Sequence, residues 1–215
     1  ERWPEVAPRA RLPRLEWPTA ADDAARHAPG DGDLVLAGES ARLELNPRRG
    51  LAARSLAFPR WHARPVLGTL AHGYFDDITL GADFYTGHVV VQRPGCPKQA
   101  DLRPVMATRT AAATPSATCE AHDGDLHVRK EWRVDPVAPV VTWRGELQLP
   151  ARRAAEIHVA HVTIVPGVFD AAALGFAVRN GGRAREVFRF RDGPVHHGEA
   201  YSTLITAKGG LGATD

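Results

Sequence analysis

The sequence has few of the residues that build the commonest metal and redox sites. It contains two cysteines, Cys96 and Cys119, outside any CxxC pattern, and a single methionine. A structural zinc site is therefore not expected. Two separate thiols fit a cytoplasmic protein best, although the sequence leaves open whether they pair across neighbouring strands. We predict no metal, no cofactor and a cytoplasmic location.

Several catalytic motifs are also missing. The chain has no HExxH, no GxSxG and no Walker-type loop, which argues against the zinc-helix hydrolases, the serine hydrolases and the P-loop enzymes. His158 and His161 are three residues apart in a strand-like segment, so they point to opposite faces and do not chelate one ion. His196 and His197 follow an Asp-Gly-Pro turn, which favours an exposed loop. No complete catalytic constellation is recognisable by spacing.

Long apolar runs and one-sided charge are absent as well. No run approaches the roughly 18 apolar residues of a transmembrane helix, and the first residues do not form a signal-peptide pattern. The net charge is +2, and acidic residues are interspersed with the arginines, so the basic stripe that binds phosphates is missing. We therefore expect neither a membrane nor a nucleic acid as partner. The excess of arginine, alanine and proline is typical of a GC-rich bacterial genome.

What the sequence does contain, over residues 34–215, is a series of short strand patterns separated by turn signals. An Asn-Pro-Arg-Arg-Gly segment at 46–50, an Asp-Gly at 123–124 and an Asn-Gly at 180–181 divide these patterns, and such signals indicate antiparallel hairpins. Little room remains for helices, so we predict an all-β antiparallel sandwich. The Gly-rich last residues suggest that a further strand follows, and we expect the chain to be part of a longer protein.

Residues 1–33 have a different character. Five prolines and two tryptophans occur in this segment. Because proline fixes φ and removes a backbone donor, the segment is predicted to be an extended linker or to lie draped over a domain surface. One or two helical turns are expected over 19–28, where Thr19 and Asp22 have the spacing of a capping box.

Three strand patterns have assignable faces. Over 126–134, alternate residues from Leu126 to Val134 point inward, and the exception to their apolar character is Lys130, whose alkyl stem is expected to lie along apolar surface. Over 41–46, two leucines point inward. The segment 155–165 is apolar on both faces, which predicts a strand in the middle of a sheet between two layers.

The stretch HGYFDDITLGADFYTGH at 72–88 is the densest in groups that bind ligands or carry out chemistry. Asp76 and Asp77 are adjacent, so in an extended chain they face opposite ways. Glycoside cleavage needs two carboxyl groups about 5–9.5 Å apart, and the spacing identifies no second carboxyl group. Sugar binding needs an aromatic face and a few polar groups, which this stretch offers. The alternative is that its aromatics are core residues and its aspartates cap turns. The predicted ligand-binding residues are His72, Tyr74, Asp76, Asp77, Asp83, Tyr85 and His88.

The hairpin ARLELNPRRGLAARSLAF at 41–58 resembles the early strands of the galactose-mutarotase-like β-supersandwich. The segments WRVDPVAPVVTWRGELQLP and AEIHVAHVTIVPGVF look like its later paired strands. The resemblance implies the fold of mutarotases and of the β domains that follow the catalytic barrel in α-mannosidase-type and family 57 amylase-type glycoside hydrolases. We assign no residues of this chain to the two histidines and the glutamate that mutarotases use.

Three functions follow as hypotheses. The first is a carbohydrate-associated domain of a glycoside-hydrolase-like protein, which binds sugar or completes the cleft of a catalytic domain in the same longer chain. The second, an aldose 1-epimerase-like enzyme, would use a histidine as acid and a carboxylate as base. The third is a structural or interaction domain without a ligand. Weak candidates for the catalytic residues of the second are His72, His88, His161 and Asp83.

Overall fold

The computed structural model describes residues 24–69, 85–111, 113–149, 156–159, 162–165, 168, 175–178 and 186–189. Strands dominate these ranges, and the only helices in them are two three-residue 3₁₀ turns, η1 (Pro29–Asp31) and η2 (Pro47–Arg49). The strands are β1 (Ala25–His27), β2 (Leu34–Ala37), β3 (Arg42–Asn46), β4 (Ala52–Ala57), β5 (Leu67–Gly68), β6 (Val89–Gln92), β7 (Gln99–Ala100), β8 (Ala107–Thr110), β9 (Ser116–Asp123), β10 (Leu126–Val134), β11 (Val141–Gln148), β12 (Glu156–Val159), β13 (Gly175–Val178) and β14 (Glu186–Arg189).

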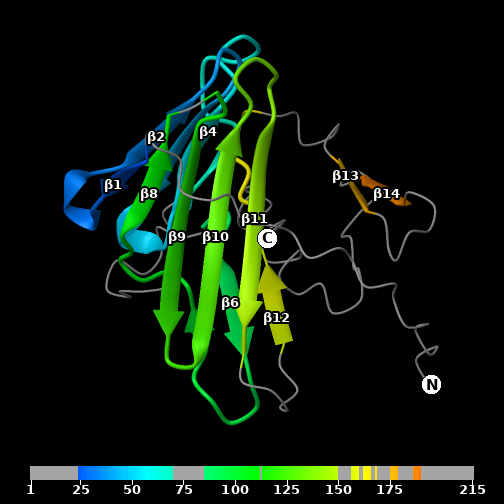
Figure 1. The fold of residues 1–215 in the computed structure, drawn as a ribbon. Coiled ribbons are helices and arrows are strands. Elements are labelled where there is room, and N and C mark those ends of the chain that lie inside the picture. The colour runs from blue at the N-terminus through cyan, green and yellow to red at the C-terminus, as the bar shows by residue number, and fades with distance from the viewer. Residues whose placement is uncertain are drawn as a thin grey trace, which may run out of the picture.

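These strands form antiparallel sheets. A five-stranded sheet has the order β1-β8-β9-β10-β11, a four-stranded sheet the order β2-β3-β4-β5, and a three-stranded sheet the order β12-β6-β7. The hairpin β13–β14 pairs separately. Long neighbouring strands such as β9, β10 and β11 run side by side along the molecule (Figure 1). The prediction of an all-β antiparallel sandwich with little helix is confirmed.

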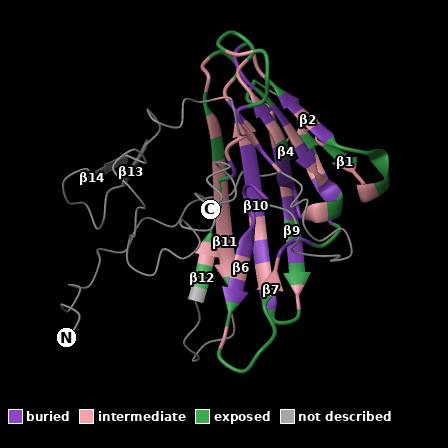
Figure 2. Ribbon diagram, turned by 180° about the vertical axis from the view of Figure 1, so that it is seen from behind, coloured by how far each residue is buried: buried purple, intermediate pink, exposed green. Residues whose placement is uncertain are grey.

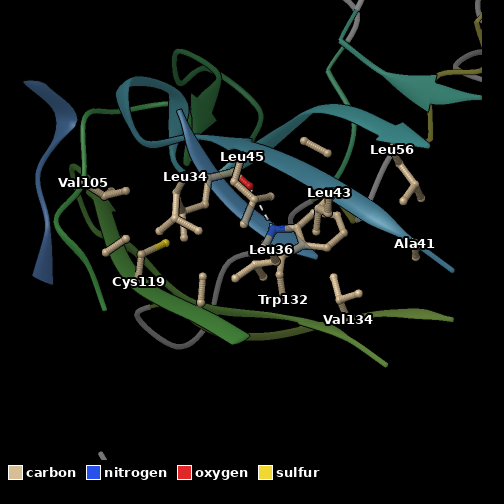
Figure 3. Close-up of a cluster of buried hydrophobic side chains, with 14 of the residues drawn as sticks. Leu34, Leu36, Ala41, Leu43, Leu45, Leu56, Val105, Cys119, Trp132 and Val134 are labelled. Carbon is tan, nitrogen blue, oxygen red and sulfur yellow. Dashed lines mark hydrogen bonds between the residues drawn. The ribbon is translucent and has the colours of Figure 1, made fainter. Parts of the chain in front are cut away.

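The five-stranded sheet is one layer, and the other two sheets cover different parts of its inner face. Leucines of β2 and β3 pack on Cys119 of β9 and on Trp132 and Val134 of β10, as Figure 3 shows. Farther along β10, Leu126 and Val128 pack on valines of β6. Buried positions accordingly run along β2, β9 and β10 (Figure 2). Each fully buried leucine contributes about 1.5–3 kcal/mol to this packing.

The predicted strand faces are correct for the first two patterns. Leu43 and Leu45 are fully buried, and the inward residues of β10 are buried too, whereas most of its outward residues are partly exposed. Lys130 departs from the prediction because its whole side chain, and not only its stem, is buried. Its ammonium group lies 2.8 Å from a carboxylate oxygen of Asp101, which is equally buried.

The prediction of one mid-sheet strand over 155–165 is wrong. β12 ends at Val159 and lies at the edge of the three-stranded sheet, and Ile157 and Val159 are each 44% exposed. A separate stretch around Ile164 forms a bridge with Leu67 of β5. The segment therefore contacts two different sheets. An apolar character on both faces did not distinguish this arrangement from a single central strand.

Most of the Pro-rich segment lies outside the described residues, which begin at residue 24. Ala25–His27 form β1 and pair with β8, so the end of the segment expected to be helical is an edge strand. His27 Nε2 and the carbonyl of Gly32 lie 3.0 Å apart, which fixes the turn that follows. No helix in the described part of the chain is long and apolar enough to cross a bilayer.

Cys96 and Cys119 do not pair. Cys96 is exposed and Cys119 is buried between the sheets. Burial raises the pKa of the Cys119 thiol to about 12, although the nearby ammonium group of Lys130 opposes this shift.

This difference predicts selective alkylation. At pH 8 the Cys119 thiol is neutral and shielded, and since the thiolate is the reactive form, iodoacetamide is expected to modify Cys96 alone in the folded protein. Both thiols are expected to react in denaturant. Mass spectrometry of the intact and digested protein measures this, and labelling of Cys119 as fast as that of Cys96 without denaturant would contradict the described packing.

Candidate ligand cavity

Of the predicted site residues, the structure describes Tyr85 and His88. His72, Tyr74, Asp76, Asp77, Asp83 and the catalytic candidate His161 lie outside the described residues. Tyr85 and His88 are both buried, at 4% and 8% exposure, and their rings meet edge to face with centroids 5.8 Å apart. Tyr85 lines a cavity, whereas His88 is not part of the described wall of that cavity. The structure therefore places only Tyr85 at a ligand-sized space.

The cavity has a volume of about 720 Å³, which is within the roughly 300–1,000 Å³ of small-molecule sites. It lies where η1, η2, the middle of β4 and the segment around Tyr85 meet. Guanidinium, amide, hydroxyl and aromatic groups line it together. The described residues of its wall are Pro29, Gly30, Asn46, Arg48, Arg49, Arg54, Thr69, Tyr85 and Pro104.

The turn between β3 and β4 carries much of this wall. Asn46 caps η2 by accepting a hydrogen bond from the Arg48 backbone N–H at 3.0 Å. Pro47 occupies the first helical position, where its missing N–H costs nothing. Gly50 ends the turn at φ +57°, and a Cβ there would lie 1.7 Å from the Asp101 carbonyl oxygen. Only glycine therefore allows the turn to approach residue 101 so closely.

The charged side chains in the described wall of the cavity are all arginines. Arg54 is paired with Asp33 at 2.6 Å on the partly exposed rim. Arg48 is held by its Nε, which donates to the Pro29 carbonyl at 3.1 Å. Neither Arg48 nor Arg49 has an ion-pair partner among the described residues. Because arginine is always positively charged in proteins, the described part of this wall holds two positive charges without an ion-pair partner among the described residues.

A network of hydrogen bonds fixes the part of the cavity wall that contains Thr69 and Tyr85. Thr86 Oγ1 donates to the Gly68 carbonyl at 2.6 Å and accepts from the Thr163 backbone N–H at 2.8 Å. Thr163 Oγ1 in turn donates to the Tyr85 carbonyl at 3.2 Å. Thr69 Oγ1 donates to the Ala53 carbonyl at 2.7 Å. These contacts join β4, β5 and the segment 162–165 to the backbone of Tyr85.

The buried ion pair of Lys130 and Asp101 is linked to the backbone near both walls of the cavity. Lys130 Nζ also donates to the Gly87 carbonyl at 3.2 Å, two residues after Tyr85. Asp101 Oδ1 accepts from the Val89 backbone N–H at 3.0 Å. The segment after Asp101 reaches the η2 turn, since the Gly50 N–H donates to the Arg103 carbonyl at 2.8 Å. The pair therefore connects the five-stranded sheet to both walls of the cavity.

Sequence reasoning missed the arginines of the site. The sequence predicts a hairpin turn at 46–50, which the structure confirms, but it does not predict a binding element there. The available signal was the pair Arg48-Arg49, which follows a proline with no acidic residue inside the turn. Arg54 and Thr69 carried no local signal, because only the pairing of β4 with β5 brings their segments together.

Comparisons with models of known protein families, with curated protein sequences and with solved structures gave no match. The likeness to the galactose-mutarotase-like supersandwich therefore stays a prediction.

Proposed function

We propose that this chain is a carbohydrate-associated β-sandwich domain that binds an acidic saccharide, a sugar bearing carboxylate or sulfate groups, in the cavity at the η2 turn. The observation that carries the proposal is that Arg48 and Arg49, which have no ion-pair partner among the described residues, lie beside Tyr85 in one cavity of suitable size. Guanidinium groups bind carboxylate and sulfate by charge-assisted hydrogen bonds.

The remaining wall groups suit a sugar ring. The Asn46 side-chain oxygen is used in capping η2, so its amide N–H₂ is the group left to donate to a hydroxyl. Tyr85 lies at the wall of the cavity, although it is 4% exposed and packs with Ala52 and Leu102, and sugar sites combine a mostly apolar lining with a small number of polar groups. The resemblance described above points to the same ligand class and to a catalytic domain in the same longer chain. Of the candidate catalytic residues of the 1-epimerase alternative, the structure describes His88, which is not part of the described wall of the cavity.

Arg49→Gln is expected to weaken binding of a hexuronate oligosaccharide by about tenfold to a hundredfold. The substitution removes a hydrogen bond to a charged group, which contributes about 1.5–3 kcal/mol. Isothermal titration calorimetry measures the change. Arg60→Gln is the matched control, because Arg60 pairs with Glu39 on an exposed turn outside the cavity, and its effect on affinity is expected to be negligible.

The ligand class is tested in the same titrations. A hexuronate oligosaccharide, its neutral hexose counterpart and a non-sugar dicarboxylate of similar charge are compared at equal ionic strength. The acidic sugar is expected to bind most tightly. Equal affinity for the dicarboxylate would show that the site binds anions in general and not sugars. Equal affinity of Arg49→Gln and the unchanged protein for the acidic sugar would refute the assignment of the cavity.

A further inference from the structure

A second cluster of ligand-type side chains lies on the outer face of the five-stranded sheet, apart from the cavity. Glu120 and His122 of β9 and His127 of β10 each offer one atom, and these three atoms lie within 4.8 Å of one another. Glu120 and His122 are exposed and His127 is partly buried. The spacing of these residues along the chain does not indicate a metal site, because the two histidines are brought together only by the hairpin.

The hairpin register places the histidines face to face. β9 and β10 are joined by the two-residue loop Gly124–Asp125, and His122 lies directly opposite His127. In antiparallel pairing, residues opposite each other on one face have Cβ atoms about 4.5–5.5 Å apart. The two imidazole rings stack with centroids 4.2 Å apart and planes 7° from parallel.

The end of the hairpin is held firmly. Asp123 accepts from the Ala100 backbone N–H at 3.0 Å and from Arg103 at 2.9 Å, and Asp125 is bound by Arg93 and Gln99. The backbone that carries the histidines is therefore fixed by residues that are not themselves ligands.

Side-chain contacts orient His127 toward Glu120. His127 Nδ1 lies 3.4 Å from Gln148 Oε1, and with Nδ1 as the donor the lone pair is on Nε2. That Nε2 has no hydrogen-bond partner and is 3.6 Å from Glu120 Oε2. In that tautomer the Nε2 lone pair faces a carboxylate oxygen, an arrangement that a bound cation would stabilise. The arrangement is that of a metal-binding histidine whose other nitrogen is held by an outer partner.

From this geometry we infer that Glu120, His122 and His127 form a binding site for a divalent transition-metal ion of the zinc class. Two imidazole nitrogens and one carboxylate oxygen are a donor set that suits Zn²⁺, Ni²⁺ and Cu²⁺. Ligand distances of about 2.0–2.1 Å place tetrahedral donor atoms about 3.4 Å apart, close to the 3.6 Å found here. Parallel rings cannot both point at one ion, so His122, which is exposed, rotates to complete the site.

The fourth coordination position would face solvent. Glu120 has 56% of its side-chain surface exposed, and its other oxygen lies 3.9 Å from Arg129 Nε. Arg129 is directly opposite Glu120 in the register, and it neutralises part of the carboxylate charge without occupying the oxygen that faces His127. The site is thus open on one side, as zinc sites with three protein ligands are.

The test is a titration of the metal-free full chain with Zn²⁺ and with Ni²⁺ in a non-chelating buffer, followed by calorimetry. We expect one ion per chain and a loss of affinity of at least about tenfold in His122→Ala and in His127→Ala, because even outer partners of metal ligands contribute about 10–100-fold. Glu120→Gln is expected to weaken binding in the same direction. His62→Ala, a histidine on the turn after β4, is the matched control and should leave affinity unchanged.

Two results would overturn the inference. One is the absence of saturable binding by either ion. The other is binding that persists in the double variant His122→Ala/His127→Ala, which would place the ion at other histidines such as His196 and His197. Circular dichroism and thermal unfolding of each variant confirm that the sheet is intact, so that a loss of binding is not a loss of fold.

Discussion

Asp101→Asn is expected to destabilise the protein by about 3–5 kcal/mol, the typical cost of leaving one member of a buried ion pair without its partner. Asp101 and Lys130 both have fully buried side chains, 2.8 Å apart. Asparagine keeps the shape and still offers an oxygen to the Val89 N–H, which Asp101 accepts in the native protein. The substitution therefore isolates the loss of the negative charge beside the buried ammonium group.

Chemical denaturation with urea measures the free energy of unfolding. Glu39→Gln is the matched control, because Glu39 and Arg60 form an ion pair with more than half of each side chain exposed, and such pairs contribute about 0–1 kcal/mol. The double variant Lys130→Met/Asp101→Asn removes both charges and is expected to recover much of the lost stability. An effect of Asp101→Asn as small as that of Glu39→Gln would show that the pair does not support the core.

The same substitution is expected to impair the cavity. Lys130 holds the Gly87 carbonyl near Tyr85, and the residues after Asp101 hold the turn that carries Arg48 and Arg49. Loss of the pair loosens both walls, so hexuronate affinity should fall even under conditions in which the variant remains folded. Glu39→Gln should leave that affinity unchanged.

Trp132→Ala is the second change with a large expected effect, about 3–5 kcal/mol of destabilisation, as for other large-to-small changes at buried aromatics. Trp132 is 5% exposed and belongs to the main core cluster. Its indole Nε1 donates to the Leu51 carbonyl at 2.9 Å, as the dashed line in Figure 3 shows. Leu51 has φ 54°, which is rare for a residue with a side chain, so this hydrogen bond fixes an unusual turn.

The ring of Trp132 also fills the space beside Gly87. A Cβ on Gly87 would lie 2.1 Å from Cζ2 of the indole ring, and Gly87 has φ +78°. Removing the ring therefore leaves a void between β10 and the segment that follows Tyr85, and voids lose both transfer free energy and packing contacts.

Thermal unfolding measures the effect of Trp132→Ala. A change of this size corresponds to a fall in Tm of roughly 6–20 °C for a chain of this length. Trp61→Ala is the matched control: Trp61 is 71% exposed and contacts Phe58 on a surface turn, so its removal should cost less than about 1 kcal/mol. Similar Tm values for the two variants would contradict the placement of Trp132 in the core.

Local patterns were sufficient to predict the longer strands. The alternation over 126–134 and the turn signals at 46–50 and 123–124 correspond to β10 and its neighbours, because period-two burial and turn chemistry act within a few residues. The short strands β1, β5 and β7 have two or three residues each. They exist only because a neighbouring strand provides their hydrogen bonds, and no pattern of so few residues could indicate them.

The residues of the cavity and of the buried ion pair were harder to predict than the strands, because they come together only through tertiary contacts. Tyr85 was predicted from its own segment, whereas Arg48, Arg49 and Arg54 entered the site through the meeting of a turn with two strands. Lys130 was recognised as an exception in its strand, but its partner Asp101 is 29 residues earlier, and nothing in the local sequence connects the two. Long-range electrostatic pairing of this kind is invisible to periodicity.

The most direct test of the proposed function is to locate the ligand. Two-dimensional ¹H–¹⁵N NMR spectra of the labelled protein, recorded during titration with a hexuronate oligosaccharide, report which amides change. The proposal predicts saturable shifts for Arg48, Arg49, Arg54, Thr69 and Tyr85, around the cavity, and little change at Trp61. Shifts centred on Trp61 or on β12, or no saturable shift with any acidic sugar, would contradict it.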